Sequence, residues 1–298
     1  MFGLGVFLAI STAFSWALAC VIHTTASKIT GIRAVMLVRQ PLASVVLGVC
    51  CLVAGDLWLP SMRLFWLSAV SGLFGIIIGD ACLYAGALTI GLRPAQVCQS
   101  LSSCFTALFS AIYLHEFIGM QGWIGMLVAT CGVILVVTSE RRDTHNPPTT
   151  RKQRRKGITL SLLAAVFLAL GLVFSKQALE EGIGALPLAF YRNAISTVGI
   201  WAIGFAIGAV APAMRSLRAN PGALKLFPLG CLFGPAGGIW LSCIALDYLP
   251  AALASMLIGL QPIALLIITG IIERRVPAVN SIIGSAVACT GAAILLLR

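Results

Sequence analysis

Charge is scarce in this sequence, and negative charge is the scarcer sign. Only 10% of the 298 residues are charged, and nine Asp and Glu stand against 20 Lys and Arg. Soluble domains carry about 25% charged residues, so this chain has too few polar side chains to cover a soluble core. The composition excludes an ordinary soluble enzyme, a disordered protein and a nucleic-acid-binding module.

Motifs of catalysis and metal binding are also missing. The sequence contains no HExxH, GxSxG or GxxxxGK[ST] pattern, and these patterns mark zinc hydrolases, serine hydrolases and phosphate-binding loops. None of the ten cysteines has CxxC spacing, and all lie in apolar segments, so we expect neither a metal centre nor a disulfide framework. We expect no catalytic residues and no cofactor.

Long apolar runs are abundant, because 59% of the residues are apolar. A membrane-spanning helix needs about 20 apolar residues, and the bilayer offers backbone amides no partner outside a helix or closed barrel. The runs are too long for barrel strands, so the fold class is predicted to be an all-α membrane protein with ten transmembrane helices. The predicted spans are Met1–Ile22, Ala34–Ala54, Leu64–Ile90, Ala95–Leu114, Gly122–Val137, Ile158–Phe174, Leu186–Val210, Leu224–Leu246, Ala251–Ile272 and Val279–Leu297.

One long polar stretch, residues 139–157, divides the ten spans five and five. It is rich in basic residues and contains Pro147 and Pro148, a composition typical of a linker. The halves 1–138 and 158–298 resemble each other: Arg39 and Arg192 occupy corresponding positions 153 residues apart, and Ala87 corresponds to Ala245. Five is an odd number, so the second copy enters the membrane from the opposite side. The sequence therefore predicts two inverted five-helix repeats, which are a hallmark of secondary transporters.

Several short segments of the two halves form a recognisable pattern. They are Gly79-Asp80, Tyr84, Ala87-Leu88, Glu116 and Gly125…Gly132 in the first half, and Ala245–Ser255, Leu260-Gln-Pro262, Glu273 and Gly284…Gly291 in the second. Together they resemble the EamA-type, ten-span branch of the drug/metabolite transporter superfamily. The usual glycine before the span-ending Glu is replaced by His115 in one half and Ile272 in the other. The resemblance implies alternating-access transport of small metabolites, often export, through a site lined by the first, third, fourth, sixth, eighth and ninth spans.

Basic residues are distributed unequally between the two sides of the ten-span arrangement. One side carries Lys28, Arg33, Arg93, Arg141, Arg142, Arg151, Lys152, Arg154, Arg155, Lys156, Arg215, Arg218, Lys225, Arg274 and Arg275; the other carries Arg63, Lys176 and Arg298. Because short loops rich in Lys and Arg stay in the cytoplasm, we expect the linker side to be cytoplasmic and both termini to face outward. The predicted location is a bacterial cytoplasmic membrane.

Asp80 is the one acidic residue placed well inside a predicted span. A carboxylate at a helix centre costs about 2.5–3.5 kcal/mol on insertion scales, so something must offset that cost. One interpretation is a coupling site that carries protons or binds a cationic group. A second is a buried ion pair with Arg39, which is predicted at similar depth, and a third is a solvated position near the cytoplasmic mouth.

Other polar and aromatic side chains in the spans are candidates for lining a substrate cavity. Gln96, Gln99 and Ser103 recur at helical spacing in the fourth span, a pattern that fits either a cavity wall or polar helix packing. Trp16 and Trp240 lie in mid-span, where they either stack on substrate or fill the core. Tyr84 shares a face with Asp80, and Gln261 precedes a proline that frees a backbone carbonyl.

Two basic residues and three pairs of glycines in the spans are further candidates for a functional or packing role. Lys176 and Arg192 lie near the outer boundary, where they are expected to snorkel or to bind an anionic solute. Close helix packing is predicted for three small-residue motifs, which are Gly75xxxGly79, Gly204xxxGly208 and Gly230xxxGly234.

The function expected from the sequence is secondary active transport of small metabolites or amphipathic compounds. The partners are a small-molecule substrate, the lipid bilayer and, through Asp80, protons, with the chain acting as a monomer or homodimer. The alternatives are an accessory membrane subunit, which leaves Asp80 and the glutamines unexplained, and an intramembrane enzyme, for which no motif is present.

The orientation predicts how a cysteine in the linker reacts. A Cys-less variant carrying Thr149→Cys should not react with a membrane-impermeant thiol reagent in intact cells, because Thr149 lies on the side with 15 basic residues. Labelling after permeabilisation is the control. Ready labelling of intact cells would reverse the predicted orientation.

Overall fold

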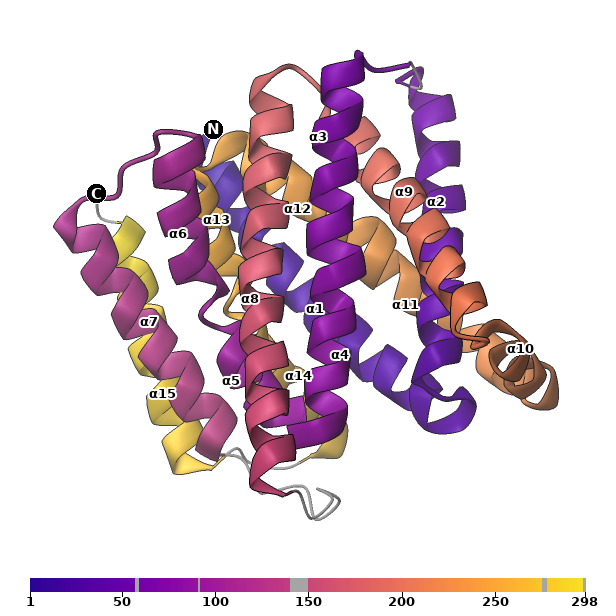
Figure 1. The fold of residues 1–298 in the computed structure, drawn as a ribbon. Coiled ribbons are helices and arrows are strands. Elements are labelled where there is room, and N and C mark those ends of the chain that lie inside the picture. The colour runs from indigo at the N-terminus through magenta and orange to yellow at the C-terminus, as the bar shows by residue number, and fades with distance from the viewer. Residues whose placement is uncertain (57–58, 91, 140–149, 275–277, 297–298) are drawn as a thin grey trace. The chain divides into compact units, whose positions relative to one another are not determined.

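The computed structural model is built from helices (Figure 1). It describes residues 1–56, 59–90, 92–139, 150–274 and 278–296, and no strand occurs among them. The greater part of the predicted linker, including Arg141, Arg142 and Thr149, lies outside the described residues, as do Arg275 and Arg298.

Helices cover most of each predicted span, and the first and sixth spans extend beyond their predicted ends. The first half holds α1 (Phe2–Thr30), α2 (Ile32–Ala54), α3 (Met62–Gly72), a π-helical segment η1 (Leu73–Ile78), α4 (Gly79–Ile90), α5 (Leu92–Gln99), α6 (Ser102–Tyr113) and α7 (Met120–Ser139). The second half holds α8 (Arg151–Glu180), α9 (Ala185–Ala206), α10 (Val210–Ala219), a 3-10 turn η2 (Pro221–Lys225), α11 (Leu226–Cys231), a π-helical segment η3 (Leu232–Ala236), α12 (Gly237–Tyr248), α13 (Ala251–Ile258), α14 (Gln261–Glu273) and α15 (Val279–Leu296).

Within the described part of the chain, eight helical stretches are long and apolar enough to cross a membrane, and a ninth is added if the bent pair α9 and α10 counts as one span. The predicted fourth span, Ala95–Leu114, is not among them, and its helix is interrupted between Gln99 and Ser102. Multiple membrane spans are therefore confirmed, whereas the count of ten stays a prediction.

Local side-chain hydrogen bonds explain where two of the helices begin. Thr150 and Gln153 form a capping box, in which the backbone N–H of Thr150 donates to Gln153 Oε1 (2.9 Å) and that of Gln153 donates to Thr150 Oγ1 (3.3 Å). This pairing satisfies two amides that have no intrahelical partner, so α8 begins at Arg151, ahead of the predicted span at Ile158. Ser61 caps α3 with a single bond, in which its hydroxyl accepts from the backbone N–H of Leu64 (3.4 Å).

The chain divides into two compact units, and each unit combines elements from both sequence halves. Unit 1 comprises Met1–Leu73 and Phe174–Tyr248, and unit 2 comprises Phe74–Val173 and Leu249–Arg298. Unit 1 holds the first and second spans with the seventh and eighth. Unit 2 holds the fourth and fifth spans with the ninth and tenth.

Corresponding helices of the two halves contact each other inside unit 1. Ser44 and Thr197, which are 153 positions apart, meet through their hydroxyls at 2.9 Å on α2 and α9. A second pair of contacts shows the same offset. Trp201 Nε1 donates to the carbonyl of Leu37 (2.9 Å). Adding 153 to Leu37 gives Phe190, and subtracting 153 from Trp201 gives Gly48; these two also meet, with the Phe190 ring 3.0 Å from the Cβ position of Gly48. Early residues of one helix face late residues of the other, so α2 and α9 run antiparallel (Figure 1).

Unit 2 repeats this arrangement with α7 and α15, which lie side by side (Figure 1). A Cβ atom at Gly132 would lie 2.6 Å from the carbonyl oxygen of Gly284, and one at Gly291 would lie 2.5 Å from that of Gly125. These four glycines are the ones that correspond between the halves at an offset of 159. The contact is antiparallel and symmetric, which is what an inverted pair of repeats produces.

The close backbone approach of α7 and α15 makes Gly132 sensitive to any side chain. Gly132→Ala should destabilise the protein by about 1–3 kcal/mol, because the added methyl has no room and the helices must separate. The measurement is the melting temperature of purified protein in detergent. Gly3→Ala is the matched control, since nothing lies within 4 Å of its Cβ position in α1, and an equal melting temperature for the two variants would contradict the packing account.

Candidate functional site

The third and eighth spans share an irregularity at corresponding positions. Each contains a π-helical segment, η1 or η3, and each resumes as an α-helix at a glycine, Gly79 or Gly237. The glycines are 158 positions apart, the same offset as Ala87 and Ala245. A Cβ at Gly79 would lie 2.9 Å from the carbonyl of Phe74, and one at Gly237 would overlap that of Leu232. The wide π turn thus requires glycine at its exit, and such turns are frequent at functional sites.

The fourth and ninth spans are interrupted as well. The helix stops between α5 and α6 at residues 100–101, and between α13 and α14 at residues 259–260, which is again an offset of 159. In the ninth span, Pro262 lies in the first turn of the new helix, where the amide hydrogen that it lacks would have no intrahelical partner. Interrupted helices in corresponding positions of two inverted repeats indicate the binding site of a transporter.

The sequence-predicted site residues of unit 2 lie at these irregularities. Asp80 and Tyr84 are half-buried on α4, with Asp80 in the first turn after η1. Gln96 and Gln99 are half-buried on α5, and Gln99 is its last residue. Gln261, also half-buried, is the first residue of α14. Arg39 is 8% exposed on α2 in unit 1, so its predicted pair with Asp80 joins residues of different units and stays a prediction.

The polar stripe predicted along the fourth span does not follow one helix, because the interruption divides it. Its α6 part is buried in packing: Ser103, Thr106 and Ser110 are at most 3% exposed. Thr106 Oγ1 lies 3.1 Å from the hydroxyl of Ser255 on α13. Thr106 therefore takes part in packing against α13, and the cavity role of Ser103 and of the glutamines of α5 stays a prediction.

The two mid-span tryptophans belong to unit 1. Trp16 and Trp240 are both half-buried, and the indole edge of Trp16 lies against the backbone of Gly238. A Cβ atom at Gly238 would overlap Cδ1 and Nε1 of that indole. Gly238, the second residue after η3, thus admits Trp16 to the eighth span, so both tryptophans lie near a π-helical irregularity.

Lys176 and Arg192 are buried rather than snorkelling, so that expectation is wrong. Arg192 is 4% exposed, its Nη1 lies 3.8 Å from the sulfur of Cys243, and its backbone packs against Gly72. Lys176 Nζ donates to the carbonyl of Leu246 (2.9 Å) near the end of α12, where the helix dipole favours a cation. Packing against neighbouring helices of unit 1 holds both side chains inside the protein.

Two further contacts were not expected from the sequence. Glu116 accepts a hydrogen bond through Oε2 from the backbone N–H of Ala251 (2.8 Å) and so satisfies an amide at the start of α13. His23 lies on the paired glycines of the eighth span, with Nε2 2.7 Å from the Cβ position of Gly230 and Cε1 3.1 Å from that of Gly234. The predicted close packing at Gly230xxxGly234 is confirmed.

Residues with metal-binding side chains form no group of three or more within the described segments.

Comparisons with known proteins agree with this geometry. A family model described as the EamA-like transporter family matches residues 3–138 and 155–297. A protein of known crystal structure shares the fold, with a TM-score of 0.74 and 14% sequence identity over 98% of this chain and 96% of the other. No curated protein matches the sequence. The predicted resemblance is confirmed: this integral, multi-pass membrane protein belongs to the EamA-like transporter family, within the drug/metabolite transporter superfamily.

Proposed function

We propose that the chain is a secondary active transporter that moves small metabolites or amphipathic compounds, in the direction of export, by alternating access. The observation that carries the proposal is the pairing of four helix interruptions, two in each half, with the candidate residues beside them. Ten spans arranged as inverted repeats over 1–138 and 158–298, joined by the 139–157 linker, are part of this proposal. An accessory subunit would have no need of such paired interruptions.

The chemistry of the candidate residues limits the substrate class. Asp80 is the one carboxylic acid among the half-buried candidates of unit 2, and the others are Tyr84 and three glutamines. Amide and phenol groups recognise neutral or zwitterionic solutes through hydrogen bonds. The tryptophans of unit 1 add apolar surface and cation–π capacity. This set favours neutral, zwitterionic or amphipathic solutes over highly phosphorylated ones.

The direct test is solute flux in proteoliposomes. Purified protein is reconstituted and loaded with pools of neutral, zwitterionic and amphipathic metabolites, and efflux is followed by mass spectrometry. We expect at least one pool to leave faster than from protein-free vesicles and to show saturation. Absence of saturable flux for every pool, with correctly folded protein in the bilayer, would contradict the proposal.

The divided stripe predicts different consequences for its two parts. Gln96→Leu with Gln99→Leu should weaken transport at least tenfold without lowering the melting temperature, because each loses a polar contact to solute. Thr106→Val is the matched control, since it removes the hydroxyl facing Ser255 and should cost about 1 kcal/mol of stability. Normal flux in the glutamine variant would assign α5 to packing.

Asp80 is proposed as the coupling residue, and Asp80→Asn separates that role from a structural one. Loss of the titrating group should abolish accumulation driven by a proton gradient while downhill exchange of solute continues. If Asp80 serves only to neutralise Arg39, the variant should instead fold poorly, at a cost of about 3–5 kcal/mol, and Arg39→Gln should restore its level. If Asp80→Asn has the proton coupling and the stability of the wild type, Asp80 is neither the coupling residue nor the partner that neutralises Arg39.

A further inference from the structure

Helix α10 follows the predicted seventh span but does not continue its direction. It is bent by 100° from α9 after a break of three residues. Ala213 and Leu217 are buried, whereas Arg215 and Arg218, on the other face, are exposed. Since α9 forms most of the predicted seventh span, we expect a helix nearly perpendicular to it to lie along the membrane surface. An amphipathic helix with arginines on its polar face is typical of that position.

The neighbouring turns of unit 1 add more positive charge and no negative charge. Lys28 and Arg33 flank the turn between α1 and α2, Lys225 ends η2, and all three are exposed. No Asp or Glu occurs in residues 1–55 or 182–246, the segments that contain these turns and α10. Five exposed cations therefore share this face without an acid in the same segments to neutralise them.

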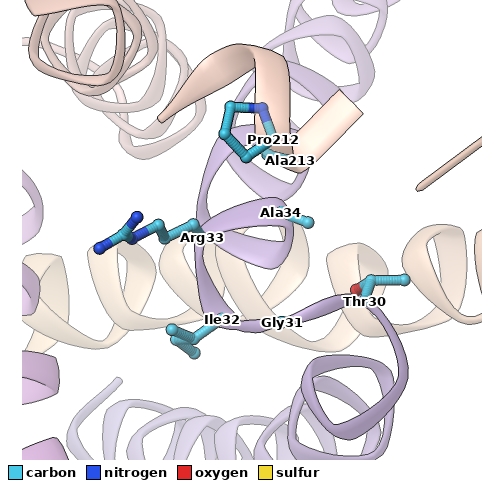
Figure 2. Close-up of a pocket in the computed structure, with 7 residues that line it drawn as sticks. All are labelled: Thr30, Gly31, Ile32, Arg33, Ala34, Pro212 and Ala213. Atoms are coloured by element: carbon cyan, nitrogen blue, oxygen red, sulfur yellow. The ribbon is translucent and has the colours of Figure 1, made fainter. Parts of the chain in front are cut away.

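A pocket of about 290 Å³ lies between the α1–α2 turn and α10. Figure 2 shows its lining, which consists of residues 30–34 together with Pro212 and Ala213. Arg33 is the one charged residue in this lining, and the rest is apolar or backbone apart from Thr30. Ser216 Oγ donates to the carbonyl of Thr30 (2.8 Å), so α10 is fixed to the turn and the pocket has a defined wall.

We propose that this face, formed by the α1–α2 turn, α10 and η2, binds an anionic membrane phospholipid. The cations would meet the phosphate and headgroup charge, and the apolar pocket would take the glycerol region or the first acyl carbons. A soluble anion fits less well, because its site would need several converging donors rather than an apolar lining. Phe205 and Ile207, at the bend before α10, are each 65% exposed, which suits contact with lipid chains near this end of α9. The proposal does not depend on the transported solute.

Native mass spectrometry of the delipidated full-length protein tests this proposal. Phosphatidylglycerol and phosphatidylcholine with the same acyl chains are titrated separately at low salt. We expect the wild type to retain phosphatidylglycerol preferentially. The triple variant Arg33→Gln, Arg215→Gln, Arg218→Gln should bind it at least tenfold more weakly, because each surface cation contributes to attraction for anionic lipid. The corresponding triple Lys variant should keep the preference.

The matched control removes the same charge elsewhere. Lys152→Gln, Arg154→Gln, Arg155→Gln changes three exposed cations at the start of α8 and should lower the affinity much less than the triple variant of the proposed face, because these cations do not line the apolar pocket of the proposed site. Equal retention of the two lipids, an equal loss in the control, or full competition by inorganic phosphate at the lipid concentration would overturn the proposal. If the triple Gln variant does not fold, Arg33→Gln is compared with Arg154→Gln by the same criteria.

Discussion

The bilayer offers no hydrogen-bond partner to the backbone, and the architecture of this protein follows from that constraint. Continuous helices satisfy each amide internally, which explains why the described residues fold as helices with few exceptions. An interruption within a span leaves carbonyls or amides to be satisfied by side chains, water or solute. Interruptions are therefore costly in a lipid-facing helix and useful beside a polar cavity. The third, fourth, eighth and ninth spans each carry one.

Repeat symmetry gives those interruptions their arrangement. Each unit brings together corresponding helices of the two halves in antiparallel contact, α2 with α9 and α7 with α15. Small residues permit the closest approach: glycines of α7 and α15 face each other's backbone, and Ser44 meets its counterpart Thr197. The regular helices of the fifth and tenth spans thus form a packed core, which includes Val133, Val136 and Ala288. The irregular helices carry the candidate polar residues.

Apolar runs and residue offsets in the sequence were sufficient to predict the helical class, the repeats and most spans. The π-helical segments were not predictable from the hydrophobic pattern, because a π turn is as apolar as the helix around it. The signal available in the sequence was the pair Gly79 and Gly237, which have the same 158-residue offset as Ala87 and Ala245. The interruption after Gln99 was not predicted, because the polar residues of the fourth span recur at helical spacing on both sides of it. The burial of Lys176 and Arg192 was missed because the position of a residue along a span does not show whether its side chain faces lipid or the neighbouring helices. His115 has φ of 55°, a left-handed conformation that favours glycine, so the family's usual glycine at that position has a backbone cause.

Hydrogen–deuterium exchange in proteoliposomes tests most directly whether the four interruptions face water and solute. Peptides that cover η1 with the first turn of α4, the α5–α6 junction, η3 with the first turn of α12, and the α13–α14 junction should exchange much faster than Val133–Val137 of α7. A transported solute should slow the interruption peptides and leave the α7 peptide unchanged. Exchange at the interruptions as slow as that in α7, with or without solute, would contradict the account, because the irregular turns would then be sealed in packing.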